Sequence, residues 1–101
     1  MNDAHCTPLR IDPAHPALAG HFPGNPVVPG VVVLERVAAA LRAWRDVRVA
    51  QLDAKFMHPL LPGEDAVIEL RGESPVRFTV IRRDGAALAR GTLVASSRES
   101  R

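Results

Sequence analysis

The chain has few of the residues that form disulfides, bind metals or stack on nucleic-acid bases. Its 101 residues include a single cysteine, Cys6, which excludes an intramolecular disulfide and a cysteine-based metal cluster. Aromatic residues make up only 4% of the chain, so little is available for stacking on bases. No two histidines have the spacing of a metal site on a helix. We therefore expect no metal, no cofactor and no nucleic-acid partner.

Long apolar runs and a strong excess of one charge are also missing. The formal net charge is +2, and no stretch approaches the roughly 20 apolar residues that a membrane span requires. The first six residues lack both the basic and the apolar part of a signal peptide. We therefore expect a cytoplasmic protein without a membrane span.

The basic residues of the second half of the chain allow two interpretations. They can form an electropositive rim that attracts an acidic protein partner, or they can be ordinary solvated arginines on strand surfaces. The arginines in question lie on or next to the predicted strands: Arg71, Arg77, Arg82, Arg83 and Arg90.

Length and composition predict one globular domain. Hydrophobic residues make up 47% of the chain and charged residues 24%, which are ordinary values for a folded domain. We expect a single domain over residues 1–95, followed by a polar, disordered tail over residues 96–101. A domain of this size buries a modest share of its apolar surface, so a partner subunit would stabilise it.

The first half of the chain predicts a strand, a long loop and a buried helix. Residues 9–12 have the character of a short strand, and the prolines and glycines between 13 and 30 exclude regular structure there. A loop of this length in a small domain is usually functional. Pro29 and Gly30 open a helix over residues 31–44, because proline is well tolerated in a first helical turn. This helix is apolar on most of its circumference, so we expect it to be largely buried.

The second half of the chain predicts four strands. Apolar and polar residues alternate over 51–56, 65–71 and 76–81, Asp84-Gly85 is a strong hairpin signal, and residues 86–95 form the last strand. We expect these strands to form an antiparallel meander that curves around the helix, which is an α+β arrangement. The helix is too apolar to be covered by one sheet face alone, which again favours a dimer.

Three short motifs carry a resemblance to a known family. The first is His21-Phe22-Pro23-Gly24, then Pro26, Pro29-Gly30-Val31 and finally Glu35, fourteen residues after His21. The second is Ala54-Lys55-Phe56 with Pro59 and Pro62-Gly63-Glu64, and the third is Gly91-Thr92-Leu93-Val94. Together, over roughly residues 7–94, the chain resembles the hotdog-fold 3-hydroxyacyl-acyl-carrier-protein dehydratases. Its short length is similar to the compact dehydratases of aryl-polyene pathways.

The resemblance implies a hotdog fold, in which a curved antiparallel sheet wraps around one long central helix. It also implies dehydration of (3R)-hydroxyacyl thioesters, held on acyl carrier protein, to trans-2-enoyl thioesters. His21 would be the base, since histidine titrates near neutral pH, and Glu35 of the other subunit would be the acid. Gly30 would let the thioester oxygen approach a backbone N–H at the helix start.

Four further residues take roles from the same resemblance. The carbonyl of Val27 would accept a hydrogen bond from the His21 ring, and Phe22 and Pro23 would shape the mouth of the acyl tunnel. Val31 would bind substrate beside the helix start. His5, His15 and His58 are predicted to lie in loops without a role.

Departures from the family pattern leave two alternatives open. Ala39 stands where family members usually carry a glutamine that helps to hold water, and Arg36 follows the acid where a small residue is common. The first alternative is a hotdog thioesterase in which Glu35 activates water. The second is a non-catalytic subunit of a heteromeric dehydratase, so the expected assembly is a homodimer or a heterodimer with a related hotdog subunit.

Overall fold

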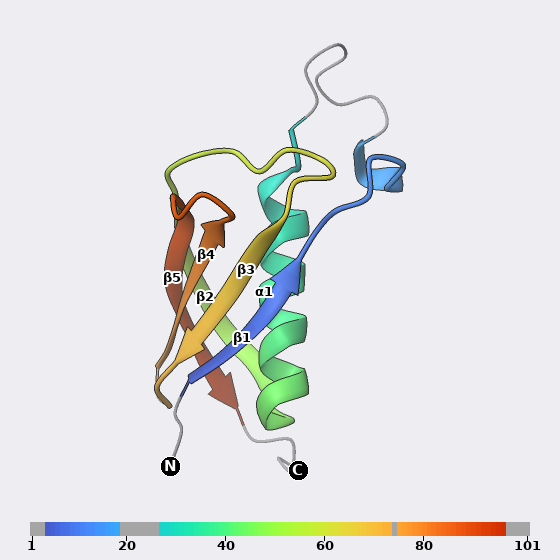
Figure 1. Cartoon of the computed structure of the whole chain (residues 1–101). Helices are drawn as coiled ribbons and strands as arrows, with labels where there is room; N and C mark the ends of the chain where they lie inside the picture. The colour runs from blue at the N-terminus through green and yellow to red at the C-terminus, as the bar shows by residue number, and fades with distance from the viewer. Residues whose placement is uncertain (1–3, 19–26, 74, 97–101) are drawn as a thin grey trace.

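The computed structural model describes residues 4–18, 27–73 and 75–96. In this part of the chain a five-stranded antiparallel sheet curves around one long helix (Figure 1). The elements in chain order are β1 (Ala4–Leu9), a 3-10 turn (Pro16–Leu18), α1 (Gly30–Arg45), β2 (Arg48–Phe56), β3 (Ala66–Arg71), β4 (Val76–Arg82) and β5 (Ala87–Ser96). Of the predicted tail, residues 96–101, only Ser96 is described, and it is the last residue of β5.

The predicted helix is confirmed with slightly wider bounds. α1 starts directly after Pro29, whose backbone is extended, with φ −60° and ψ 143°. It ends at Arg45, and the C-cap residue Asp46 adopts a left-handed φ of 52° and donates its N–H to the Arg42 carbonyl at 2.8 Å. Val33, Val37 and Leu41 recur every four residues and form the buried face. No helix within the described ranges has the length and apolar content needed to span a bilayer.

The last three strands, β3, β4 and β5, form an antiparallel meander, as expected. β3 pairs with β4, and β4 pairs with β5, both antiparallel. The predicted hairpin turn at Asp84-Gly85 is present: Gly85 has a φ of 94° and donates its N–H to the Arg82 carbonyl at 2.8 Å. Glycine suits this position because other residues rarely adopt a positive φ.

The prediction of a four-stranded meander is wrong at β2. This strand pairs with β5 rather than with β3, and the strand order is β1-β3-β4-β5-β2. The reason lies in the connection between β2 and β3, which crosses the end of the barrel-like sheet instead of turning back. Its Leu60 is buried in the core, and its Gly63 donates an N–H to the Ile11 carbonyl at 2.8 Å.

The predicted strand over residues 9–12 is also wrong. The first strand is β1, which pairs antiparallel with β3 and ends at Leu9. Leu9 and Ile11 are both buried, but Ile11 lies in the loop that follows β1. β1 is hard to recognise from the sequence because it contains Pro8, and it tolerates this proline because it stands at the edge of the sheet.

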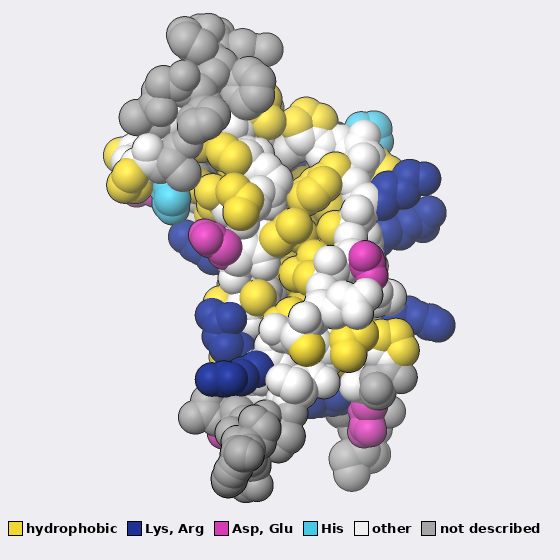
Figure 2. Space-filling model, turned by 180° about the vertical axis from the view of Figure 1, so that it is seen from behind, with side chains coloured by type: hydrophobic (Ala, Val, Ile, Leu, Met, Phe, Trp, Pro, Cys, Tyr) yellow, Lys and Arg dark blue, Asp and Glu magenta, His cyan; other side chains and the backbone are white. Residues whose placement is uncertain are grey.

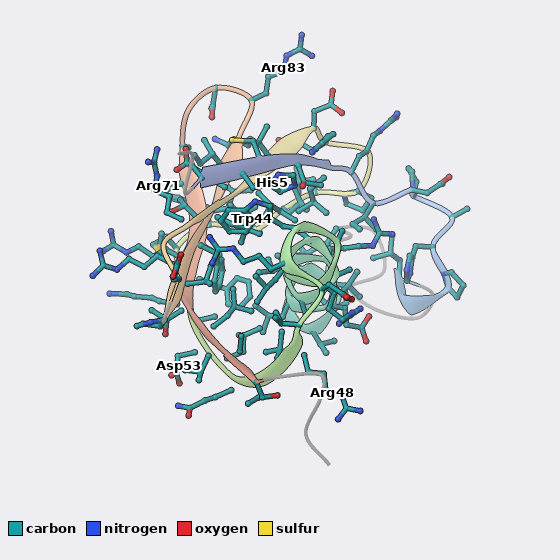
Figure 3. The ribbon with its side chains drawn as sticks, turned by 90° about the horizontal axis from the view of Figure 1, so that it is seen from below. His5, Trp44, Arg48, Asp53, Arg71 and Arg83 are labelled. Carbon is teal, nitrogen blue, oxygen red and sulfur yellow. The ribbon has the colours of Figure 1, made fainter. Side chains whose placement is uncertain are left out.

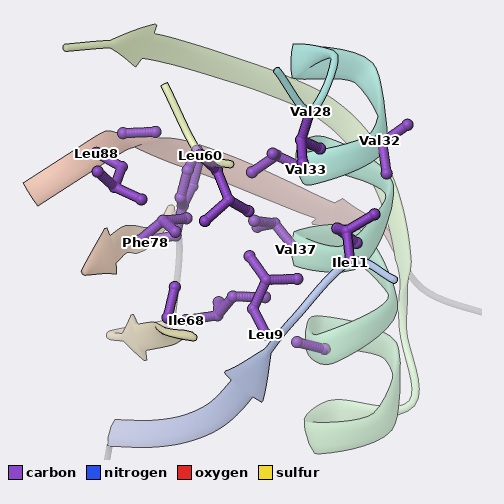
Figure 4. Close-up of a cluster of buried hydrophobic side chains, with 14 of the residues drawn as sticks. Leu9, Ile11, Val28, Val32, Val33, Val37, Leu60, Ile68, Phe78 and Leu88 are labelled. Atoms are coloured by element: carbon purple, nitrogen blue, oxygen red, sulfur yellow. The ribbon is translucent and has the colours of Figure 1, made fainter. Parts of the chain in front are cut away.

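The core lies between α1 and the concave face of the sheet. It is almost wholly aliphatic, as the scarcity of aromatic residues predicts, with Phe78 as its largest fully buried side chain (Figure 4). At the far end of the helix the rings of His5 and Trp44 stack, with their centres 5.5 Å apart (Figure 3). The Arg45 guanidinium lies 3.8 Å from the Trp44 ring centre. These contacts tie β1 to the end of α1.

Candidate functional site

An open pocket of about 370 Å³ lies at the N-terminal end of α1. Three of its residues, Val28, Val33 and Leu60, are at most 4% exposed and form its apolar floor (Figure 4). Its described lining, in chain order, is Val27, Val28, Gly30, Val33, Phe56, Met57, His58, Pro59 and Leu60. The pocket therefore joins the start of the helix to the segment that follows β2.

Backbone hydrogen bonds fix the two walls of this pocket. The N–H of Val28 donates to the Leu60 carbonyl at 2.9 Å and bridges one wall to the other. The N–H groups of Met57 and His58 both donate to the Leu88 carbonyl, at 2.8 and 3.2 Å. Main-chain bonds thus hold the two segments that carry the lining residues.

Gly30 is the residue at which the helix meets the pocket. A Cβ atom at this position would lie 3.1 Å from the Cζ atom of Phe56, so a larger residue would press against the ring. The N-cap residue Pro29 offers no side-chain hydrogen bond to the first turn. The first N–H groups of a helix have no acceptor within the helix, and they lie at the positive end of its dipole. This end of α1 is therefore suited to a developing negative charge on a substrate oxygen.

The structure brings together only some of the predicted site residues. Val27 is half-buried and lines the pocket beside Gly30. Val31 is 63% exposed and does not belong to the described pocket lining. His21, Phe22 and Pro23 lie outside the described residues.

Glu35 points away from the pocket of its own chain. It is exposed, whereas Val33, two positions earlier on the same helix, forms part of the pocket floor. At about 100° per residue, the two side chains leave the helix roughly 160° apart. The carboxylate therefore faces the surroundings of the subunit rather than the pocket at its own helix start.

Sequence reasoning missed the whole second wall of the pocket. Phe56 through Leu60 line it, although the sequence predicted only a strand end and a turn there, and no role for His58. One signal was present, because Phe56 and Pro59 belong to the second motif that matches the family. The motif showed that the segment resembles the family, but the residues alone do not show which part of the fold it faces.

The arginines of the second half divide into paired and exposed residues. Three of the five lie within 4 Å of a carboxylate, and such surface pairs contribute little to stability. The pairs are Arg71–Glu69 at 3.2 Å, Arg82–Asp84 at 2.8 Å and Arg83–Asp65 at 3.7 Å. Of the two interpretations, solvated and locally paired arginines fit these three residues, while Arg77 and Arg90 are exposed.

Comparison with known proteins places the chain in a family. A family model described as "ApeI-like: ApeI dehydratase" matches residues 2–92. The bifunctional enzyme LpxC/FabZ of Chlorobaculum tepidum is 36% identical over 90 residues, which are 78% of this chain and 19% of that protein. The 3-hydroxyacyl-(acyl-carrier-protein) dehydratase FabZ of Cronobacter sakazakii is 35% identical over 91 residues, which are 78% of this chain and 60% of that protein. The chain thus spans three fifths or less of the length of these relatives.

A solved structure agrees with this placement at the level of the fold. A chain of the dehydratase heterocomplex ApeI:P from Xenorhabdus doucetiae superposes with a TM-score of 0.81 at 20% identity, covering 94% of this chain and 88% of that one. The fold is therefore the hotdog fold, as the resemblance implied. On the strength of the family model, the chain belongs to the ApeI-like dehydratase family.

Proposed function

We propose that the protein dehydrates (3R)-hydroxyacyl thioesters held on acyl carrier protein to trans-2-enoyl thioesters. Family membership supports a dehydratase, and the printed name of the FabZ relative supports a carrier-bound 3-hydroxyacyl substrate. The observation that carries the proposal is the pocket at the start of α1. It combines an apolar floor for an acyl chain with an uncapped helix terminus at Gly30.

The proposed reaction removes a proton from C2 and the hydroxyl from C3 of the substrate. His21 takes the C2 proton, and the charge that develops on the thioester oxygen is stabilised by the N–H of Gly30. Glu35 of the other subunit donates a proton to the departing hydroxyl, which leaves as water while the C2–C3 double bond forms. The Val27 carbonyl orients the His21 ring, and Phe22 and Pro23 form the tunnel mouth.

A second subunit is part of the same proposal. β2 stands at the end of the strand order and pairs with β5 alone in the described part of the chain. Its last residue, Phe56, is 46% exposed, and hydrophobic side chains reach the surface in several clusters on the rear face of the molecule (Figure 2). An exposed strand edge with apolar surroundings favours pairing with another chain. Because Glu35 points away from its own pocket, such a partner is also where its carboxylate can act.

One specific observation favours the alternative of a non-catalytic subunit. Ala39, one helical turn after Glu35, replaces the glutamine that the family resemblance leads one to expect. The structural neighbour comes from a heterocomplex, so a heterodimer with a related hotdog subunit is a reasonable second form of the proposal. For both forms of the proposal, the homodimer and the heterodimer, we propose the cytoplasmic location that the sequence leads us to expect.

The test is direct incubation with 3-hydroxyacyl carrier proteins of short and medium chain length. Mass spectrometry of the carrier protein should show the loss of one water per acyl group. His21→Ala should lower the rate at least about 100-fold, the usual scale of a lost general base, whereas the matched control His15→Ala should be unaffected. Full turnover by His21→Ala would disprove the assignment of the base.

The same assay separates the rival functions. Release of free thiol from the carrier protein, without an enoyl product, would instead support the thioesterase. Turnover that appears only after a second hotdog subunit is added would support the heteromeric form.

A further inference from the structure

We propose that His58 is a substrate-binding residue that contacts the polar arm of the thioester at the rim of the pocket. This inference rests on the proposed function, since it assigns one end of that substrate to one side chain. The acyl group would lie on the floor of the pocket, and the amide groups of a pantetheine-type arm would lie against the imidazole.

The chemistry of the lining singles out His58. Among the nine described lining residues it is the one with a polar side chain; the other eight are apolar or glycine. The imidazole takes part in no hydrogen bond or ion pair with any other described residue. A ring that can donate and accept hydrogen bonds therefore lies beside an apolar lining, with no partner among the residues that the structure describes.

The difference in burial between the floor and the rim of the pocket determines which end of the substrate lies at each place. Val28, Val33 and Leu60 at the floor are buried, whereas His58 and Pro59 at the rim are exposed. An acyl chain gains free energy by leaving water, so it belongs on the floor. The arm connects to a carrier protein outside the pocket, and it must pass the rim. Its secondary amides need hydrogen-bond partners there, and the ring of His58 can serve as one.

The backbone at His58 is held in place independently of its side chain. Its N–H donates to the Leu88 carbonyl, and the following Pro59 restricts His58 to an extended conformation. The ring is therefore presented at a fixed point of the rim. For the same reason, replacing the side chain should leave this wall of the pocket intact, and the variants should fold.

The test compares two thioesters that carry the same 3-hydroxyacyl group. One is the pantetheine thioester, and the other is the S-propyl thioester, which lacks both amides. His58→Ala should raise KM for the pantetheine substrate about 2- to 10-fold, the range expected for one hydrogen bond. It should leave kcat within about twofold and should not affect the S-propyl substrate. His58→Gln, which keeps a donor and an acceptor, should recover part of the loss, and His15→Ala is the control.

A binding measurement keeps this inference separate from the proposed reaction. Calorimetry with a saturated, amide-linked acyl-pantetheine analogue reports Kd without any turnover. A weaker Kd for His58→Ala with no dehydration by the wild type would sustain the role of His58 and reject the reaction. Active wild-type enzyme with an unchanged KM and Kd in His58→Ala would overturn the inference alone. An equal loss on both thioesters, or no binding of the analogue by the wild type, would also overturn it.

Discussion

Gly91 on β5 pairs with Ala54 of β2 on one side and with Phe78 of β4 on the other. A Cβ atom at this position would overlap the carbonyl oxygen of Asp53 and would lie 2.8 Å from the Cε2 atom of Phe78. The glycine in the third motif therefore has a packing explanation: it lets the edge strand and the largest core ring approach the same point of β5.

We expect Gly91→Ala to destabilise the protein by roughly 1–3 kcal/mol or more, because the added methyl group forces the backbone or the ring to move. Urea denaturation followed by circular dichroism would measure the free energy of unfolding. Arg90→Ala, an exposed position on the same strand, is the control and should stay within about 0.5 kcal/mol of the wild type. A Gly91→Ala protein as stable as that control would contradict the packing explanation.

The carboxylate of Asp84 makes the stability of the β4–β5 turn depend on pH. The Arg82 side chain hydrogen-bonds to its carboxylate, the N–H of Ala86 donates to it as well, and together they lower the pKa of Asp84 to about 2. A carboxyl group whose pKa is lower in the folded state contributes its stability in full above the unfolded pKa near 3.8. This contribution is lost as the pH falls from about 4 to about 2.

Asp84→Asn should therefore remove part of the dependence of stability on pH between pH 4 and pH 2. Because the group is exposed, we expect a small effect, visible as a shallower decline of the melting temperature in acid than in the wild type. Val94→Thr, an exposed neutral position on β5, is the control and should keep the wild-type slope. Identical slopes for Asp84→Asn and the wild type would show that the turn carboxylate is not linked to acid stability.

At the scale of elements, α1 stabilises the fold through one face only. Leu41 is fully buried against the sheet, and the next residue, Arg42, is exposed. Leu41→Ala should cost about 2–5 kcal/mol, because it removes buried methyl groups and leaves a cavity. Arg42→Ala changes the same turn of the same helix and should cost about 0.5 kcal/mol or less. Chemical denaturation of both variants tests this, and equal losses would mean that the helix is not packed as described.

The elements that depend on local signals could be predicted from the sequence. The helix has no proline or glycine between its ends, and the β4–β5 hairpin has an Asp-Gly turn. The pairing of β2 with β5 depends instead on where Leu60 is buried, which is a long-range contact without a local pattern. The predicted first strand, residues 9–12, lies later in the chain than β1. Leu9 and Ile11 both look like core residues of a strand, but only Leu9 belongs to β1.

The candidate site also contains residues that the sequence predicts and residues that only the fold brings together. Gly30 and Val27 could be proposed from the motif and are found in the pocket. Phe56 and His58 could not be assigned to it, because the crossing of the chain after β2 brings them to the helix start. The direction of Glu35 follows from helix geometry once Val33 is known to line the pocket. Which residues on the helix face the pocket cannot be known until the second wall is placed.

At the scale of the whole molecule, the described subunit separates two groups that the proposed reaction needs together. The pocket lies on one side of the start of α1, and Glu35 points to another side. β2 meanwhile leaves one strand edge unpaired among the described residues. We therefore expect native mass spectrometry to show a dimer, alone or with a related hotdog subunit. A protein that stays monomeric and is nevertheless fully active would contradict the expectation that a second subunit supplies Glu35.

The most direct test of the shared site mixes two inactive variants, His21→Ala and Glu35→Gln. If each site takes His21 from one subunit and Glu35 from the other, a mixed dimer contains one intact site and one site with both changes. Random exchange makes half of the dimers mixed, so the mixture should regain about a quarter of the wild-type dehydration rate. Glu73→Gln, another exposed glutamate, should by itself remain fully active. If the two variants exchange subunits, as native mass spectrometry can verify, and the mixture still produces no enoyl thioester, the shared site is disproved.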